Sequence, residues 1–405
     1  MTTPPAGPRA LLLENVDERG IRLLEGAGWD VQTETRAFDE DELIARLAGV
    51  QVLGIRSKTE LTPRVFHNAP ELIAVGAFCI GTNQIDLGAA SRQGIAVFNA
   101  PFSNTRSVVE LVLAEIISLY RRLPAKTAGM HAGTWDKSAQ GSHEVRGRTL
   151  GIVGYGKIGS QLSVLAENLG LRVLFYDVAD RLALGNARAC ACLEELLGEA
   201  DVVTLHVDGR PGNSGLFGER EFALMRDESL FLNLSRGFVV DHDALRRHLE
   251  SGHLAGAAID VFPSEPKGRG DVFESSLRGL PNVILTPHIG GSTEEAQRDI
   301  GEFVAAKVRD FVRAGTTSLS VNLPELGLPA LGSGQRLAHL HANVPGVLAK
   351  VNGILAEAAV NVESQLLGTR GELGYVLTDI GCRGDDRVIR QLNVLEETIR
   401  LRVLP

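Results

Sequence analysis

Short apolar runs alternate with amphipathic segments along the first hundred residues of the chain. The apolar runs predict strands, and the segments with helical spacing between them predict helices. Strands that are separated by helices form parallel β-α-β units, so this block is expected to be a doubly wound sheet. The expected strands are residues 10–14, 30–35, 50–55, 72–75 and 95–98, and the clearest helices are 18–27 and 39–47.

A long helical pattern over residues 105–122 separates this block from a second one of the same type. Six strands in about 140 residues, with helices between them, are typical of a complete dinucleotide-binding sheet. The expected strands of the second block are residues 150–154, 172–177, 201–207, 230–234, 257–261 and 283–285.

A third block follows residues 328–334, a stretch rich in Gly, Pro and Ser that has no periodicity and is expected to be a linker. The remaining pattern predicts the βαββαβ order of ferredoxin-like folds. Its expected elements are a strand at 336–341, a helix at 345–358, strands at 361–367 and 374–380, a helix at 385–398 and a strand at 399–404.

Composition narrows the classes of function. Apolar residues make up 44% of the chain, which argues against disorder, and the net charge of −9 offers no basic surface to nucleic acid. No charge-free stretch is long enough to suggest a membrane span, and residues 1–8 lack the features of a signal peptide. The four cysteines lack the C-x-x-C spacing of zinc or redox sites, so we expect free thiols, no metal and a cytoplasmic location.

The most specific short motif is the glycine pattern G-x-G-x-x-G, which follows an expected strand and opens an amphipathic helix. The first glycine allows a tight turn, the second lets a pyrophosphate approach the backbone, and the third lets the helix pack on the sheet. Asp177 ends the next strand, where its carboxylate would bind ribose hydroxyls and favour NAD over NADP. The motif residues are Gly154, Gly156, Lys157, Ile158 and Gly159.

Three later segments carry acidic, basic and imidazole groups at the carboxyl ends of expected strands, where open α/β sheets bind their ligands. Hydride transfer between an alcohol and NAD needs a proton acceptor that works near pH 7 and a cation for an anionic substrate. The segments are residues 233–237, 259–266 and 285–293.

Together with the glycine motif, these segments resemble the D-2-hydroxyacid dehydrogenase family. More narrowly, residues 78–86, 99–107 and 286–294 resemble the bacterial branch that oxidises D-3-phosphoglycerate and is inhibited by L-serine. The resemblance covers essentially the whole chain. It implies a flavodoxin-like substrate domain at 1–103 and 292–331, a Rossmann NAD domain at 104–291 and an ACT regulatory domain at 336–405.

Carried over residue by residue, the resemblance implies a catalytic triad. His288 would exchange the proton of the substrate hydroxyl, Glu265 would hold the imidazole and raise its pKa, and Arg236 would bind the substrate carboxylate and carbonyl. Asp260 would accept a hydrogen bond from the nicotinamide carboxamide. Further contacts with NAD are expected from Leu234, Ser235, Gly290 and Gly291.

The same resemblance implies two further small-molecule sites. The substrate would bind backbone N–H groups near Gly81, its phosphate would meet Arg56 and Ser57, and Lys137 would come from a neighbouring subunit. L-serine would bind the ACT domain, with His341 and Asn343 at its carboxylate and hydroxyl and Asn361 at its amino group or carboxylate. Dimer contacts at Trp135 and at the ACT edge strands would build a homotetramer.

Two other interpretations remain open on the residues alone. The chain could act on another 2-hydroxy acid, or also reduce 2-oxoglutarate, and the phosphate site distinguishes these possibilities. It could also be an NAD-sensing, corepressor-like binding protein on the same fold, and a measurement of hydride transfer separates that reading from the enzymatic ones.

Overall fold

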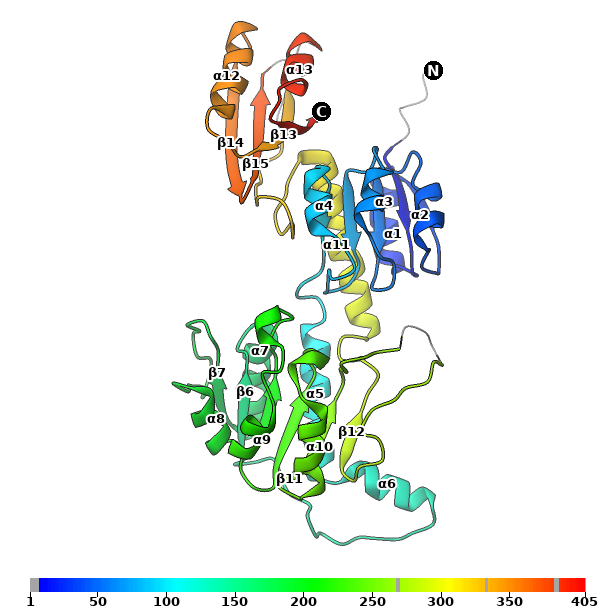
Figure 1. Cartoon of the computed structure of the whole chain (residues 1–405), viewed down its shortest axis with the longest axis vertical. Helices are drawn as coiled ribbons and strands as arrows, with labels where there is room; N and C mark the ends of the chain where they lie inside the picture. Colours follow the sequence, from blue (N-terminus) through cyan, green and yellow to red (C-terminus); the bar gives the residue numbers. More distant parts are fainter. Residues whose placement is uncertain (1–6, 267–269, 332–333, 382–385, 405) are drawn as a thin grey trace. The chain divides into compact units, whose positions relative to one another are not determined.

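The computed structural model describes residues 7–266, 270–331, 334–381 and 386–404. The chain forms two compact units (Figure 1), one made of residues 1–103 and 297–405 and the other of residues 104–296. Each is described separately below. Among the described residues, no helix is both long and apolar enough to cross a membrane.

The first unit contains a parallel five-stranded sheet in the order β2-β1-β3-β4-β5, which is the flavodoxin-like order. Side chains alternate along each strand, so the sheet has a hydrophobic core on each face. Leu12 lies in the core on one face and Leu11 in the core on the other. The strands are β1 (Arg9–Leu12), β2 (Asp30–Thr33), β3 (Val52–Ile55), β4 (Ala74–Ala77) and β5 (Ala96–Phe98), and the helices are α1 (Glu18–Gly26), α2 (Glu40–Arg46), α3 (Pro63–His67), α4 (Leu87–Arg92) and α11 (Glu294–Ala314).

An antiparallel four-stranded sheet, in the order β14-β15-β13-β16, completes the first unit. It packs on the C-terminal end of α11, where Phe311 shares a core with Tyr375 and Leu377. Arg402 donates hydrogen bonds to the carbonyl oxygens of Phe311 and Val312 near the end of the helix. The elements are β13 (Gln335–Ala342), α12 (Val347–Glu357), β14 (Val362–Arg370), β15 (Leu373–Ile380), α13 (Asp386–Asn393) and β16 (Thr398–Leu404).

The second unit is a parallel seven-stranded sheet in the order β12-β11-β10-β9-β6-β7-β8, the Rossmann order extended by one strand. The strands are β6 (Thr149–Val153), β7 (Arg172–Tyr176), β8 (Arg188–Ala189), β9 (Val202–Leu205), β10 (Ser229–Asn233), β11 (Leu254–Ile259) and β12 (Val283–Leu285). The helices are α5 (Thr105–Tyr120), α6 (Leu123–His131), α7 (Lys157–Asn168), α8 (Leu193–Glu199), α9 (Glu219–Leu224) and α10 (His242–Glu250), with 3-10 turns η1 (Pro211–Asn213) and η2 (Gly237–Val239).

The fold class and the order of the blocks agree with the sequence prediction, and several details differ. The second sheet has seven strands rather than six, because the two-residue β8 is too short to show a period. The helix expected at 105–122 ends at Tyr120, and a separate helix, α6, begins at Leu123 after Arg122 adopts a left-handed conformation. Pro124 lies in the first turn of α6, where a missing N–H costs nothing, and does not end a helix. Residues 332–333 of the expected linker lie outside the described residues.

A buried ion pair supports the junction between the antiparallel sheet and α11. Asp379 accepts hydrogen bonds of 2.6 and 2.8 Å from the guanidinium of Arg336, whose side chain is 2% exposed. Asp379→Ala leaves that cation buried without its partner, so the free energy of unfolding should fall by about 3–5 kcal/mol in urea denaturation. The exposed pair Arg9–Asp30 is the control, and Asp30→Ala should cost at most about 1 kcal/mol. Equal losses in the two variants would contradict this account.

Candidate active site and dinucleotide site

The glycine loop of the second unit connects β6 to α7, and a different feature of the surroundings explains why each of its three positions is glycine. Gly154 has a φ of +93°, and a Cβ there would lie 2.6 Å from the carbonyl oxygen of His206. A Cβ on Gly159 would collide with the carbonyl oxygen of Gly154. A Cβ on Gly156 would meet no atom within 4 Å, so space remains beside the backbone for a phosphate.

The N-terminus of α7 lies beside that open space and has no side-chain cap. Gly156 is its N-cap and offers no side chain to the first-turn N–H groups, while Lys157 and Ile158 begin the helix. A helix end of this kind attracts anions through its free N–H groups and its dipole. The loop therefore fits the pyrophosphate of a dinucleotide.

Asp177, directly after β7, is tied to the glycine loop. One of its carboxylate oxygens accepts the backbone N–H of Tyr155 at 2.8 Å and the other accepts that of Ala179 at 2.9 Å. Arg181 approaches the carboxylate to 3.4 Å. The expected bond to ribose stays a prediction. Tyr155, which the sequence did not single out, stacks on Phe175 with ring centroids 3.8 Å apart and so helps to hold the loop.

A hydrogen-bonded imidazole and carboxylate pair lies after β11 and β12 in the same unit. His288 Nδ1 donates to Glu265 Oε2 at 2.8 Å, and Glu265 Oε1 accepts the backbone N–H of Phe262 at 3.0 Å. The bond to Glu265 outweighs burial and raises the pKa of His288. Burial would raise the pKa of Glu265, but the hydrogen bonds from His288 and Phe262 outweigh it and the pKa is lowered. The bond occupies Nδ1, so Nε2 is the ring nitrogen left to exchange a proton with a ligand.

Asp260 fixes the loop that carries His288. Its carboxylate accepts the hydroxyl of Thr286 at 2.6 Å and the backbone N–H groups of Ile289 and Gly290, both at 2.8 Å. Its carbonyl accepts the N–H of His288, a non-glycine residue with a φ of +54°. Asp260 is 1% exposed, and the hydrogen bonds that it makes in the structure hold this loop in shape. The expected contact with a nicotinamide stays a prediction.

The turn after β10 carries Arg236 and is held by a buried amide. Asn233 accepts the backbone N–H of Ser235 at 3.0 Å and its hydroxyl at 2.8 Å, and donates to the carbonyl of Arg236. Leu234 and Ser235 are 7% and 5% exposed. Arg236 lies close enough to Glu265 and His288 to influence the pKa of each electrostatically. The second unit therefore brings the three expected catalytic side chains together.

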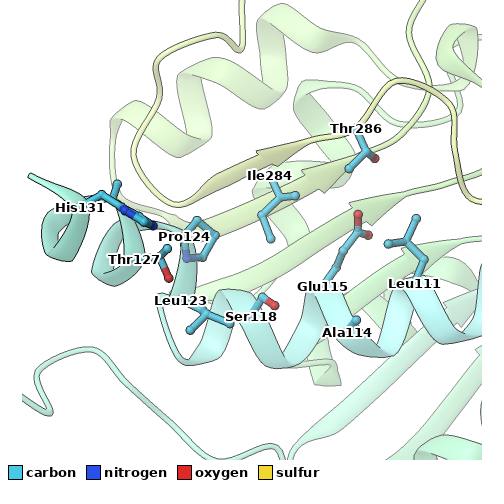
Figure 2. A pocket seen from close by; sticks show the side chains of 11 residues that line it. Leu111, Ala114, Glu115, Ser118, Leu123, Pro124, Thr127, His131, Ile284 and Thr286 are labelled. Atoms are coloured by element: carbon cyan, nitrogen blue, oxygen red, sulfur yellow. The ribbon is translucent and has the colours of Figure 1, made fainter.

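Glu115, which lies on α5 near β12, is a buried carboxyl that was not predicted from the sequence. Glu115 of α5 is 3% exposed, and its two carboxyl oxygens have no hydrogen-bond partner among the described residues. Burial, with the nearby Asp260 charge, raises the pKa of Glu115 to about 8. Figure 2 shows its carboxyl pointing toward β12, near Ile284 and Thr286. These residues line a pocket of about 520 Å³. An isolated Glu in an apolar helix carries no signal that separates it from a surface residue.

The other expected residues lie at the ends of elements in both units. Arg56 and Ser57 follow β3, Gly81 follows β4, Gly291 follows Gly290 in the loop after β12, and Lys137 lies in the exposed segment after α6. In the antiparallel sheet, His341 is 4% exposed, while Asn361 is exposed and the Asn343 side chain donates to the carbonyl of Gly371. Among the described residues no group of His, Cys, Asp and Glu could hold a metal ion, and Cys382 lies outside them.

Comparison with known proteins agrees with this geometry. Residues 113–290 match the family described as D-isomer specific 2-hydroxyacid dehydrogenase, NAD binding domain, and residues 337–400 match the AHAS small subunit-like ACT domain. The D-3-phosphoglycerate dehydrogenase of Haemophilus influenzae is 49% identical over 395 residues, covering 97% of this chain and 96% of that protein. That of Escherichia coli strain K12 is 48% identical over 397 residues, covering 97% of each.

A similar protein of known structure contains NAD. The D-lactate dehydrogenase of Aquifex aeolicus, complexed with NAD and lactic acid, is 27% identical with a TM-score of 0.64, covering 75% of this chain and 95% of that one. The NAD-binding family and such neighbours confirm NAD as the cofactor predicted from the glycine motif.

Two glycine substitutions should separate the folding role of the loop from its binding role. Gly154→Ala forces a side chain into a left-handed position against the His206 carbonyl, so it should lower the melting temperature and abolish NAD binding. Gly156→Ala meets open space, so the melting temperature should change little while NAD affinity falls about tenfold or more. Thermal melts and calorimetric titration with NAD measure both. Unchanged affinity in Gly156→Ala would show that phosphate does not approach this residue.

Proposed function

The chain belongs to the D-3-phosphoglycerate dehydrogenase branch of the NAD-dependent D-2-hydroxyacid dehydrogenases, and we propose that it oxidises D-3-phosphoglycerate to 3-phosphohydroxypyruvate, the first step of L-serine biosynthesis. The observation that carries the proposal is the pair His288–Glu265, with Arg236 nearby, in a chain that matches these relatives over nearly its full length. A C-terminal ACT domain accompanies the dehydrogenase domains.

In the proposed mechanism, His288 is the general base of oxidation. Its Nε2 takes the proton of the substrate hydroxyl, and Glu265 stabilises the imidazolium that forms. NAD, when bound, accepts the hydride from the substrate carbon. Arg236 binds the substrate carboxylate and polarises the developing carbonyl, while Asp260 keeps the His288 loop in position. In reduction the imidazolium returns the proton to the oxygen.

The proposed substrate is distinguished from other 2-hydroxy acids by its phosphate. We assign the phosphate to Arg56 and Ser57, with Lys137 as a further cation, and the carboxylate to backbone N–H groups near Gly81. Arg56 is partly buried, and its guanidinium donates to the carbonyl of Glu14 at 3.4 Å, so its side chain is held rather than free in solvent. Reduction of 2-oxoglutarate, which carries no phosphate, is the alternative activity of the same site.

L-serine is the proposed effector of the ACT domain. His341 Nδ1 donates to the carbonyl of Ala342 at 2.7 Å, and its buried Nε2 has no hydrogen-bond partner among the described residues. Nε2 is therefore the ring nitrogen that we propose for the carboxylate or hydroxyl of serine. Asn343 and Asn361 are proposed for the other polar groups of serine. Inhibition would then be a coupling free energy between the ACT site and the catalytic site.

We further propose that the enzyme works as a cytoplasmic homotetramer. Trp135, 77% exposed, offers a large apolar side chain for one dimer contact, and β14 is an edge strand of the antiparallel sheet that can pair with a second copy. An NAD-sensing, corepressor-like protein is the second candidate. The hydrogen-bonded pair of His288 and Glu265 favours the enzyme, because a sensor has no need of a proton acceptor.

A steady-state assay tests this function. The wild-type enzyme with NADH should reduce 3-phosphohydroxypyruvate with a kcat/KM at least about tenfold above those for hydroxypyruvate and 2-oxoglutarate, because only the first carries the phosphate. His288→Gln should lower kcat about 10²–10⁴-fold with NAD affinity retained. No oxidation of NADH with any of the three acids would favour the sensor. The same assay with L-serine tests regulation: rates unaffected at saturating serine would reject the effector.

The pH dependence should report the His288–Glu265 bond. Glu265 raises the pKa of His288, so Glu265→Gln should lower it. Oxidation needs the neutral ring and is lost as pH falls through this pKa, so the acid limb of kcat/KM should move to lower pH in the variant. Reduction needs the imidazolium, so its loss at rising pH should also begin at lower pH. An acid limb that stays in place would show that Glu265 does not set the titration.

A further inference from the structure

Two consecutive non-glycine residues adopt left-handed backbone conformations just beyond β1. Glu14 has a φ of 64° and Asn15 a φ of 57°, a combination that costs free energy at each position. Their backbone N–H groups donate to the carbonyls of Arg36 at 3.3 Å and Glu34 at 3.2 Å, which helps to hold the turn. The turn directs the Glu14 side chain, 7% exposed, toward the loop that follows β3, the neighbouring strand in the sheet.

The Glu14 carboxylate accepts hydrogen bonds from three backbone N–H groups of that loop. Its Oε1 accepts from the N–H groups of Arg56 at 3.2 Å and Thr59 at 2.9 Å, and its Oε2 accepts from that of Lys58 at 3.0 Å. Converging backbone N–H groups form an anion-binding site. Here the anion is part of the chain, so these three donors are already used.

The opposite side of Arg56 is held from the loop that follows β4. Gln84 Nε2 donates to the Arg56 carbonyl at 2.5 Å, and Cys79 Sγ donates to the same oxygen at 3.6 Å. The guanidinium of Arg56 donates in addition to the Glu14 carbonyl. The N–H, the carbonyl and the side chain of Arg56 are thus each bonded to a neighbouring strand end, and all four bonds span more than 20 residues of sequence.

We propose that Glu14 and Gln84 are positioning residues that hold Arg56 and Ser57 in the orientation that selects a phosphorylated substrate. This inference rests on the proposed function. Because Glu14 occupies the N–H groups of Arg56, Lys58 and Thr59, these three donors are not available to the substrate phosphate, and the direction of the Arg56 guanidinium then decides selectivity. Glu14 itself does not touch the substrate. A Gln at position 14 keeps the shape but has only one acceptor oxygen for three donors.

The test compares KM values in the full-length enzyme. Glu14→Gln and Glu14→Ala should raise KM for 3-phosphohydroxypyruvate about 10- to 100-fold, with kcat within about threefold and KM for hydroxypyruvate within about twofold. Gln84→Leu removes the Gln84 bonds to the Arg56 carbonyl and to Cys79 Sγ but keeps the Glu14 bonds, so it should shift the same KM in the same direction by less. Asp39→Asn is the matched control, because this carboxylate caps α2 through the N–H of Glu42 and should change neither KM.

Two further readouts separate positioning from a merely structural role. Formate added to Glu14→Ala can occupy the vacated donors and should lower KM for 3-phosphohydroxypyruvate toward the wild-type value, with no effect on Asp39→Asn. Amide hydrogen exchange should rise at residues 56–59 in Glu14→Ala. Faster exchange there with both KM values unchanged in all Glu14 and Gln84 variants would overturn the proposal, because the contacts would then be structural only.

Failure of the proposed function is recognised in the wild-type enzyme. If wild type does not prefer 3-phosphohydroxypyruvate to hydroxypyruvate, the substrate assignment fails irrespective of Glu14. The positioning role is then judged on the 2-oxo acid that wild type does reduce. An unchanged KM for that acid in Glu14→Ala would overturn the positioning role as well, and a raised KM that formate reverses would support it.

Discussion

The hydrogen bond between His288 Nδ1 and Glu265 Oε2 determines what the second unit can do chemically. It fixes the tautomer of the ring, leaves Nε2 as the nitrogen that can exchange a proton and raises the pKa of His288, three effects that a general base near neutral pH needs. Other hydrogen bonds hold both partners in position. Phe262 donates its N–H to Glu265, and Asp260 holds the loop that carries His288.

The same structural device recurs at the carboxyl ends of both parallel sheets. A buried or half-buried carboxylate accepts backbone N–H groups and so fixes the loop that presents a functional residue. Asp260 does this for the His288 loop, Asp177 for the glycine loop and Glu14 for the Arg56 loop. Charge-assisted bonds of this type are stronger than neutral ones and cost little where the N–H groups would otherwise lack partners. Loops at strand ends can therefore be irregular and still hold side chains in defined positions.

Local signals and the family resemblance predicted the fold class, the NAD site and the three side chains that the second unit gathers. The glycine loop can be predicted because its three glycines lie within one β-α turn, although the contact that excludes a side chain at Gly154 comes from His206, far along the chain. Glu14 was not predicted, because its partners lie more than 40 residues away and no local pattern records them. The helix α6 was not among the expected elements, although Pro124 suits a first helical turn. Burial of His341 follows from packing between strands, which periodicity does not resolve.

The most direct test of the account is an NMR titration of the His288 ring in the unliganded wild-type protein. The account predicts that the pKa of His288 lies above its ordinary value of about 6.5, because the Glu265 carboxylate stabilises the imidazolium more than burial opposes it. The titration is independent of any substrate, so it examines the pair itself. A pKa of His288 at or below about 6.5 would contradict the account, because Glu265 would then not be preparing the ring as a base.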